Sequence, residues 1–147
     1  MGGHPYWYFV NHNGDIHQAL RDLREREFHA GRYSPAMHFI HFPLNIDSPT
    51  PEPKHDSIEA VLRASAESGT RSILDIERIA TEPRTRVAAP LEHDILQALY
   101  GTTEPSHEMV ENNLDFLEAV ERGHCFYFAI YEDGQPSELL FAGYSFD

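Results

Sequence analysis

Residues 125–146 read CFYFAIYEDGQPSELLFAGYSF. Residues 125–131 are mostly aromatic or apolar, a composition that favours a β-strand. Asp133 and Gly134 follow as a turn signal, and the apolar run at 139–146 predicts a returning strand. The sequence therefore predicts an antiparallel β-hairpin in this region.

Residues 4–10, HPYWYFV, form a second aromatic run and predict another strand. Both runs are too aromatic to lie exposed, so we expect this strand to pair with the hairpin. Between them, apolar residues recur at helical spacing in four segments, which are 15–30, 56–67, 91–100 and 106–122. Together these patterns predict an α+β fold, with a single domain over residues 1–147 and an antiparallel sheet packed by three to four helices.

The remaining segments carry weaker signals. Residues 37–42 are short and apolar and predict a strand that ends at Pro43. Residues 73–76 fit either a short strand or a helical turn, and their isoleucines favour the strand. Proline-rich, irregular loops are expected near 43–55 and 81–90.

Charge is distributed unevenly along the chain. The net charge is −13, from 24 acids and 11 bases. Residues 87–147 contain twelve acids and one base, Arg122, whereas residues 1–86 contain twelve acids and ten bases. A surface of one sign attracts an oppositely charged partner and repels nucleic acid. The sequence therefore predicts a basic protein as partner and argues against DNA or RNA.

Four acids in the segment 106–122 have a helical spacing. They are Glu108, Glu111, Asp115 and Glu118, which a continuous helix would place on one face. One interpretation is a face that binds a basic protein, with fast electrostatic association. The other is a solvated face that keeps the protein soluble.

Metal chemistry has little support in the spacing of the histidines. His38 and His41 are three residues apart, and on a strand they would point to opposite faces. No metal or cofactor is predicted, apart from adventitious copper or nickel at His4 if Met1 is removed, since the chain then begins Gly-Gly-His.

Catalytic motifs are absent from the sequence, so no catalytic residue is predicted. No nucleophile elbow, phosphate loop or dinucleotide fingerprint occurs. His124 and Cys125 are neighbours, but adjacent strand residues face opposite ways, and a buried strand cysteine is usually inert.

The expected compartment is the cytoplasm. No apolar run approaches the length of a membrane-spanning helix, and no secretory signal is visible. The single cysteine excludes an internal disulfide, which fits a reducing compartment. We therefore expect a soluble protein that does not bind membranes.

The two end motifs carry a resemblance. MGGHPYWYF at residues 1–9 and FAGYSFD at 141–147 resemble the ends of a small uncharacterised bacterial protein family. The resemblance covers these motifs alone and implies no activity and no site residues.

Two functions follow as hypotheses. The first is a non-enzymatic, acidic protein-binding module, and an immunity- or antitoxin-like inhibitor of a cationic enzyme fits that charge by analogy. The alternative is a small enzyme or small-molecule binder, in which His38, His41, Tyr8 and Tyr127 converge in a cleft beside the sheet.

Overall fold

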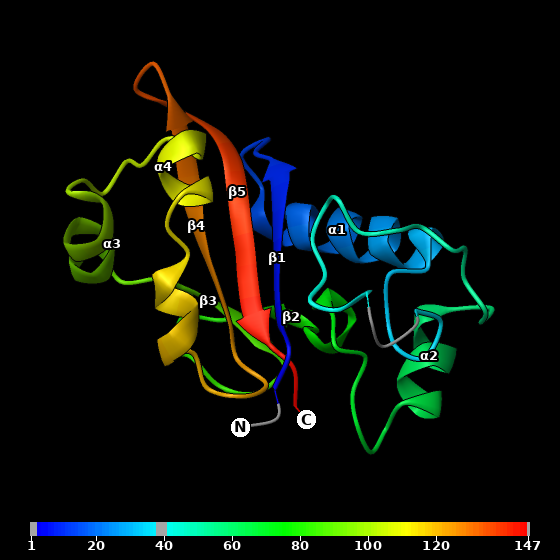
Figure 1. The fold of residues 1–147 in the computed structure, drawn as a ribbon. Helices are drawn as coiled ribbons and strands as arrows, with labels where there is room; N and C mark the ends of the chain where they lie inside the picture. The colour runs from blue at the N-terminus through cyan, green and yellow to red at the C-terminus, as the bar shows by residue number, and fades with distance from the viewer. Residues whose placement is uncertain (1–2, 38–40, 147) are drawn as a thin grey trace.

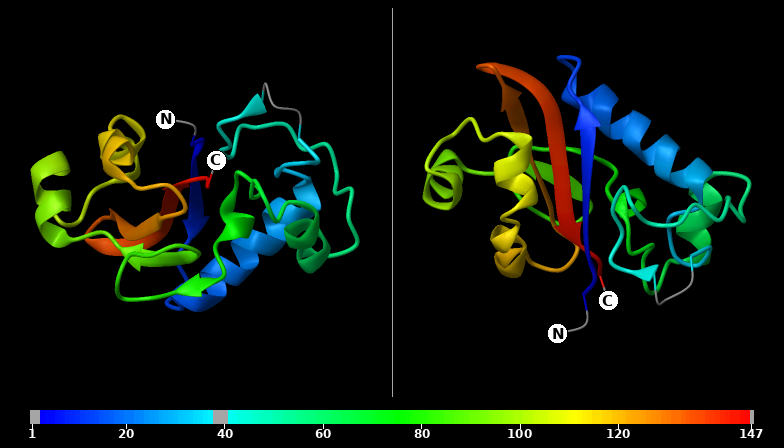
Figure 2. Two further views of the ribbon diagram at one scale, coloured as in Figure 1. Left: turned by 90° about the horizontal axis from the view of Figure 1, so that it is seen from below. Right: turned by 45° about the horizontal axis from the view of Figure 1, so that its top comes forward.

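A single sheet forms the centre of the protein. The computed structural model describes residues 3–37 and 41–146. Five strands follow the order β1-β5-β4-β3-β2, and helices cover both faces of the sheet (Figures 1 and 2). The α+β class predicted from the sequence is confirmed.

The elements have the following bounds. The strands are β1 (Pro5–Asn11), β2 (Arg78–Ile79), β3 (Val87–Pro90), β4 (Cys125–Glu132) and β5 (Gln135–Tyr144). The helices are α1 (Ile16–Ala30), α2 (Ile58–Ala64), η2 (Ile73–Asp75), α3 (His93–Tyr100), α4 (His107–Glu111) and η3 (Asp115–Ala119), where η marks a 3-10 helix. Among the described residues, no helix has both the length and the apolar character needed to cross a membrane.

Strand β1 lies beside the C-terminal hairpin. It pairs antiparallel with β5, where Tyr8 is opposite Phe141, and Phe141 is opposite Tyr127 of β4. The blue start of the chain therefore lies next to its red end (Figure 1). The predicted pairing of the first strand with the hairpin is confirmed, and it makes β1 an edge strand of the sheet.

Each face of the sheet packs against its own helices. Tyr6 and Tyr8 belong to a core cluster with Leu23 of α1. Trp7 and Phe9, which alternate with them along β1, pack against the cluster formed with α3, α4 and η3. Because both faces are covered, β1 needs apolar side chains at nearly every position, and its sequence shows no polar alternation.

Helix α1 begins and ends where its local signals predict. The Asp15 side chain accepts a hydrogen bond from the Gln18 N–H at 3.1 Å, which caps the first turn. Gly31 ends the helix in the left-handed region at a φ of 72°.

The segment at 73–76 is not a strand, and that prediction was wrong. Residues 73–75 form η2, in which the Ser72 hydroxyl accepts a hydrogen bond from the Leu74 N–H at 3.2 Å. The Ile76 N–H then donates to the Ile73 carbonyl at 2.9 Å. The serine cap favours the helical turn, and the isoleucines are buried there as they would be in a strand.

Two short strands were not predicted. Strand β3 lies inside the stretch expected to be irregular, and it pairs parallel with both β4 and β2. The side chains of Val87, Ala88 and Ala89 are all buried. This short run therefore lacks the alternation of polar and apolar residues that indicates a strand. The sheet is consequently mixed, with two parallel strands added to the predicted antiparallel part.

The predicted helix over 106–122 is divided into α4 and η3. Asn113 divides it, because its side-chain oxygen accepts from the Asp115 N–H at 3.0 Å. Its amide donates to the Leu99 carbonyl at 3.3 Å, and the Tyr100 hydroxyl donates to the Asn113 carbonyl at 2.6 Å. The Asp115 N–H is thus used by the Asn113 side chain and the Asn113 carbonyl by Tyr100 of α3, so neither backbone group continues the helix.

Of the predicted strand at 37–42, residues 38–40 lie outside the described residues, and residues 37, 41 and 42 do not belong to a strand. Its neighbour Leu44 forms an isolated parallel bridge to Tyr6. This bridge places the start of the proline-rich loop beside β1.

Candidate protein-binding surface

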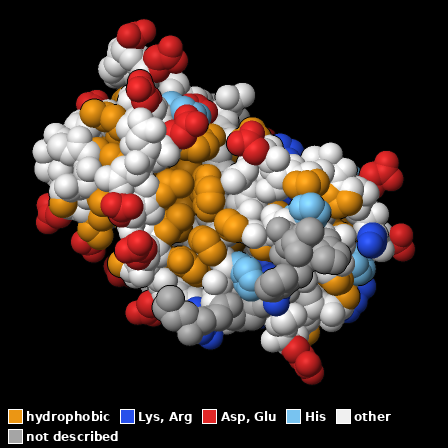
Figure 3. Space-filling view, viewed as in Figure 1, with side chains coloured by type: hydrophobic (Ala, Val, Ile, Leu, Met, Phe, Trp, Pro, Cys, Tyr) orange, Lys and Arg blue, Asp and Glu red, His pale blue; other side chains and the backbone are white. Residues whose placement is uncertain are grey.

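The four predicted partner-binding acids lie on two short helices. Glu108 and Glu111 are on α4, whereas Asp115 and Glu118 are on η3, and all four side chains are exposed. Acidic side chains are visible along this part of the molecule in Figure 3. Because Asn113 interrupts the helix, the four acids do not form one continuous row.

The acids of this region have no arginine or lysine partners within the part of the chain that the structure describes. Glu111 and Glu138 both pair with His107, at 3.1 and 2.8 Å. Glu121 lies 3.7 Å from His124. Among the described residues, the acids of 87–146 therefore form ion pairs with histidine but none with arginine or lysine.

The negative charge of this region contributes to a raised pKa at Tyr100. Its pKa is raised to about 12, first because the phenol is partly buried and second because the charge of Asp115 disfavours a phenolate.

A groove with a volume of about 840 Å³ runs along the outer edge of β1, and we call it the edge groove. One wall comes from α1 and the loop 45–47, and the opposite wall comes from α4 and β5. Trp7 and Phe9 of β1 line its floor, and Ile46, which is 52% exposed, lies on its rim. Figure 3 shows hydrophobic side chains gathered over the middle of this face.

The polar lining of the edge groove is mainly acidic. Its carboxylates are those of Asp22, Asp47, Glu111 and Glu138. Arg26 is the base that lines it, and its Nε donates to the buried carboxylate of Glu27 at 2.9 Å. The groove therefore combines aromatic surface with a net negative charge.

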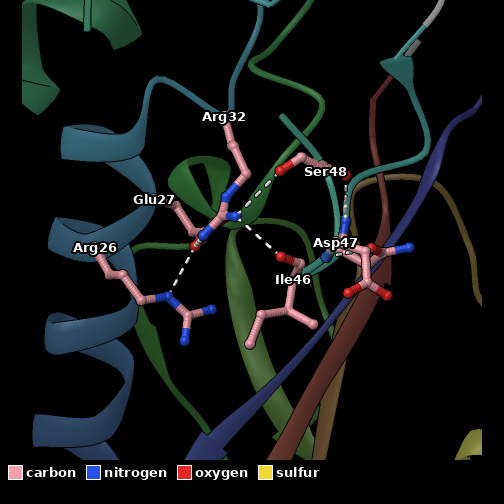
Figure 4. Close-up of polar contacts among 7 residues, drawn as sticks. Arg26, Glu27, Arg32, Ile46, Asp47 and Ser48 are labelled. Carbon is pink, nitrogen blue, oxygen red and sulfur yellow. Dashed lines mark hydrogen bonds and ion pairs between the residues drawn. The ribbon is translucent and has the colours of Figure 1, made fainter. Parts of the chain in front are cut away.

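A buried ion cluster holds the loop wall in place. Glu27 is 0% exposed, and both of its oxygens accept hydrogen bonds from Arg32 at 2.7 Å. The remaining nitrogen of Arg32 donates to the carbonyls of Ile46 and Ser48, at 3.2 and 3.4 Å (Figure 4). The end of α1 is thus tied to the loop that bounds the groove.

His107 links the opposite wall to β1. Its ring lies over that of Phe9 with centroids 4.2 Å apart, and its two nitrogens face the carboxylates of Glu111 and Glu138. The two carboxylates lie on different sides of the imidazole, which is unsuited to holding one metal ion. No metal-ligand cluster is found among the residues that the structure describes.

The side chains named for the alternative hypothesis do not line the edge groove. Tyr8 and Tyr127 lie on the α1 face of the sheet with Phe141 between them, and Tyr8 is fully buried. His41 is exposed in the loop after α1, and His38 lies outside the described residues. The second hollow, between α1 and α2, is lined by none of the tyrosines or His41 either.

Cys125 is poorly suited to nucleophilic chemistry. It is 0% exposed, and burial raises the pKa of its thiol to about 12. A thiolate is therefore scarce at neutral pH, in agreement with the interpretation of an inert strand cysteine.

The copper or nickel arrangement at His4 stays a prediction, because Gly2 lies outside the described residues. It would require a deprotonated backbone nitrogen at His4. That N–H donates to the Ser145 hydroxyl at 2.8 Å, so metal binding would disrupt this end of β1.

Comparisons with known proteins give no further information on this surface. No protein-family model, curated protein or solved structure matches the chain.

Sequence reasoning found one member of the edge groove, Glu111. It missed Asp22, Asp47 and Glu138, which come from α1, a loop and β5. These residues converge only through the pairing of β1 with β5 and the packing of α1. The signal that the sequence offers is the aromatic run of residues 4–10, which predicts a strand paired with the hairpin but not a groove beside it.

Proposed function

We propose that the protein is a non-enzymatic binding module that captures a basic partner protein through the acidic surface of residues 87–146. One observation supports this most directly. The exposed acids of this region, Glu108, Asp115 and Glu118 among them, have no lysine or arginine partner within the described residues. A cationic partner would supply the missing charges.

The edge groove adds a reason to favour a protein partner. Exposed aliphatic and aromatic surface beside charge is typical of protein interfaces, where a desolvated centre contributes affinity and the charged rim contributes rate and selectivity. Ile46 and Met109 are exposed by 52% and 44%, and they lie on the groove's rim and on α4.

Inhibition is the form of binding that suits this chemistry by analogy. An acidic protein that covers the cationic surface of an enzyme blocks its access to an anionic substrate. An immunity- or antitoxin-like role is therefore part of the proposal, with a basic enzyme as the partner.

The test compares two charge-neutralised variants as baits in a lysate of the source organism. The first neutralises the predicted surface, and its substitutions are Glu108→Gln, Glu111→Gln, Asp115→Asn and Glu118→Gln. The matched control removes the same charge from exposed acids elsewhere, with Glu25→Gln, Glu59→Gln, Glu67→Gln and Glu82→Gln.

We expect the wild type and the control to retain a basic protein, and the surface variant to bind it at least about tenfold more weakly. Affinity should fall as salt is added, because exposed charge pairs are screened. Equal retention by all three baits, or the absence of any basic partner, would refute the proposed function.

A further inference from the structure

The backbone of β1 presents unused hydrogen-bonding groups to the edge groove. Residues of an antiparallel strand alternate between facing their partner and facing away. The His12 N–H donates to the Ser137 carbonyl of the hairpin at 3.1 Å, so Phe9 and Asn11 direct their N–H groups to the other side. No acceptor for either N–H occurs among the described residues.

The same edge is already used at one position by the chain itself. The Trp7 N–H faces outward and donates to the Leu44 carbonyl at 3.2 Å, within the parallel bridge between Tyr6 and Leu44. The chain then turns away, because the Asn45 side chain accepts from the Asp47 N–H at 2.8 Å. The edge of β1 is therefore able to pair with an extended segment. Its second half, at Phe9 and Asn11, pairs with no segment among the described residues.

The two edges of the sheet differ. Strand β2, at the opposite edge, is only two residues long, whereas β1 is seven residues long. Short edge strands are a common protection against unwanted pairing, and a long open edge is usually covered or used for binding.

The charge of the groove selects the kind of segment that fits. An added strand directs its side chains alternately to the two walls. One wall carries Asp22 and Asp47, and the other carries Glu111 and Glu138. Basic side chains on the α1 side would meet Asp22 and Asp47, while apolar ones on the α4 side would contact Trp7 and Phe9.

We propose that the edge groove receives an extended basic segment of the partner protein, which pairs with the backbone of β1 at Phe9 and Asn11 as a sixth strand. This inference rests on the proposed function and specifies how the partner is held. Backbone pairing supplies affinity, and alternating basic and apolar side chains supply selectivity. A second copy of this chain is disfavoured as the occupant, because each copy carries a net charge of −13.

The probe is a capped peptide of about seven residues that alternates arginine and valine, long enough to span the open edge. Two further peptides have the same side chains. One carries N-methyl groups on its odd-numbered residues, and the other carries them on its even-numbered residues. Only one set of alternate N–H groups in a strand faces its neighbour. One methylated peptide should therefore lose binding and the other should keep it.

Amide hydrogen exchange of the protein gives the direct readout. With the peptide bound, the Phe9 and Asn11 amides should exchange at least about tenfold more slowly, because both gain an acceptor. The amides of Tyr8 and Val10 face β5 and serve as internal controls.

A pair of variants tests the backbone contact without changing any charge. Asn11→Pro removes the outward N–H, and proline is tolerated on edge strands where this group faces solvent. Asn11→Ala removes the same exposed side chain but keeps the N–H. The proline variant should bind the peptide about two- to tenfold more weakly than the alanine variant.

The outcomes separate this inference from the proposed function. In one outcome the four-acid surface variant loses peptide binding, but the Phe9 and Asn11 amides gain no protection and the two Asn11 variants bind equally. This outcome overturns strand addition and leaves the acidic binding surface standing. Protection that grows with protein concentration in the absence of peptide identifies a second copy as the occupant and overturns the basic segment. Failure of the peptide to bind at about millimolar concentration overturns strand addition, whatever the lysate capture shows.

Discussion

The acids of residues 1–86 and those of residues 87–146 differ in the charged groups that pair with them. In residues 1–86, Glu77 lies 3.9 Å from Arg86, and the buried Glu27 is held by Arg26 and Arg32 at 2.9 and 2.7 Å. In residues 87–146 the acids are exposed apart from the half-buried Glu138, and the described ion pairs involve histidine only. A buried ion pair of carboxylate and arginine thus ties the structure together in the first part, and no such pair occurs among the described residues of the second.

Removal of the buried carboxylate should have the largest effect on stability. Glu27→Ala leaves Arg32, which is 6% exposed, without its counter-charge. Loss of one member of a buried pair costs about 3–5 kcal/mol. The free energy of unfolding, measured by chemical denaturation, should fall by that amount.

Glu25→Ala is the control for this variant, since Glu25 lies on the same helix but is exposed and pairs with the exposed His29 at 3.4 Å. It should change the free energy of unfolding by less than about 0.5 kcal/mol. Equal effects of the two variants would show that burial does not distinguish these charges.

High pH should destabilise the core on the α1 face. Burial raises the pKa of the Cys125 thiol from its ordinary value of 9.0 to about 12, and it raises the pKa values of Tyr6 and Tyr8. The unfolded chain then loses these protons before the folded protein does, so stability is complete below pH 9 and falls as pH rises. Between 9.0 and about 12, Cys125 alone should cost about 1.4 kcal/mol per pH unit.

Denaturation curves across this pH range, for the wild type and Cys125→Ala, would measure that dependence. The alanine variant should show the smaller decline, because the tyrosines still contribute. Identical slopes for the two proteins would contradict the raised thiol pKa.

The break between α4 and η3 should contribute an intermediate amount. Asn113→Ala removes hydrogen bonds to the Asp115 N–H and the Leu99 carbonyl. The free energy of unfolding should fall by about 1 kcal/mol. The exposed neighbour Asn112→Ala should change it by less than about 0.5 kcal/mol, and an equal loss in both would argue against this role of Asn113.

The smallest effect on stability should come from the acidic surface itself. Neutralising Glu108, Glu111, Asp115 and Glu118 together removes exposed like charges and should leave the free energy of unfolding within about 0.5 kcal/mol of the wild type. A large destabilisation in denaturant would show that these acids support the fold, in contradiction of the comparison above.

Local signals made much of the fold predictable. Asp15 and Gly31 bound α1 through contacts within a few residues, and Asp133-Gly134 sets the hairpin turn. Strand β3 escaped prediction because its partner β4 is distant in the sequence, and the break at Asn113 did so because it also depends on contacts with Leu99 and Tyr100 of the preceding helix.

The candidate surface was predictable in its charge but not in its shape. The excess of acids after residue 86 is plain in the sequence, and Glu111 was named from helical spacing alone. The edge groove also needs the bridge from Tyr6 to Leu44 and the contact of Arg32 with Ile46, which no local pattern specifies.

The central claim is that the unbalanced acids of residues 87–146 recognise a cationic protein. Calorimetric titration of the captured partner against the wild type and the four-acid surface variant, at low and high salt, tests this most directly. The account predicts tight binding by the wild type that weakens strongly with salt, and weak binding by the variant that changes little. Affinities that coincide for the two proteins at both salt concentrations would contradict it.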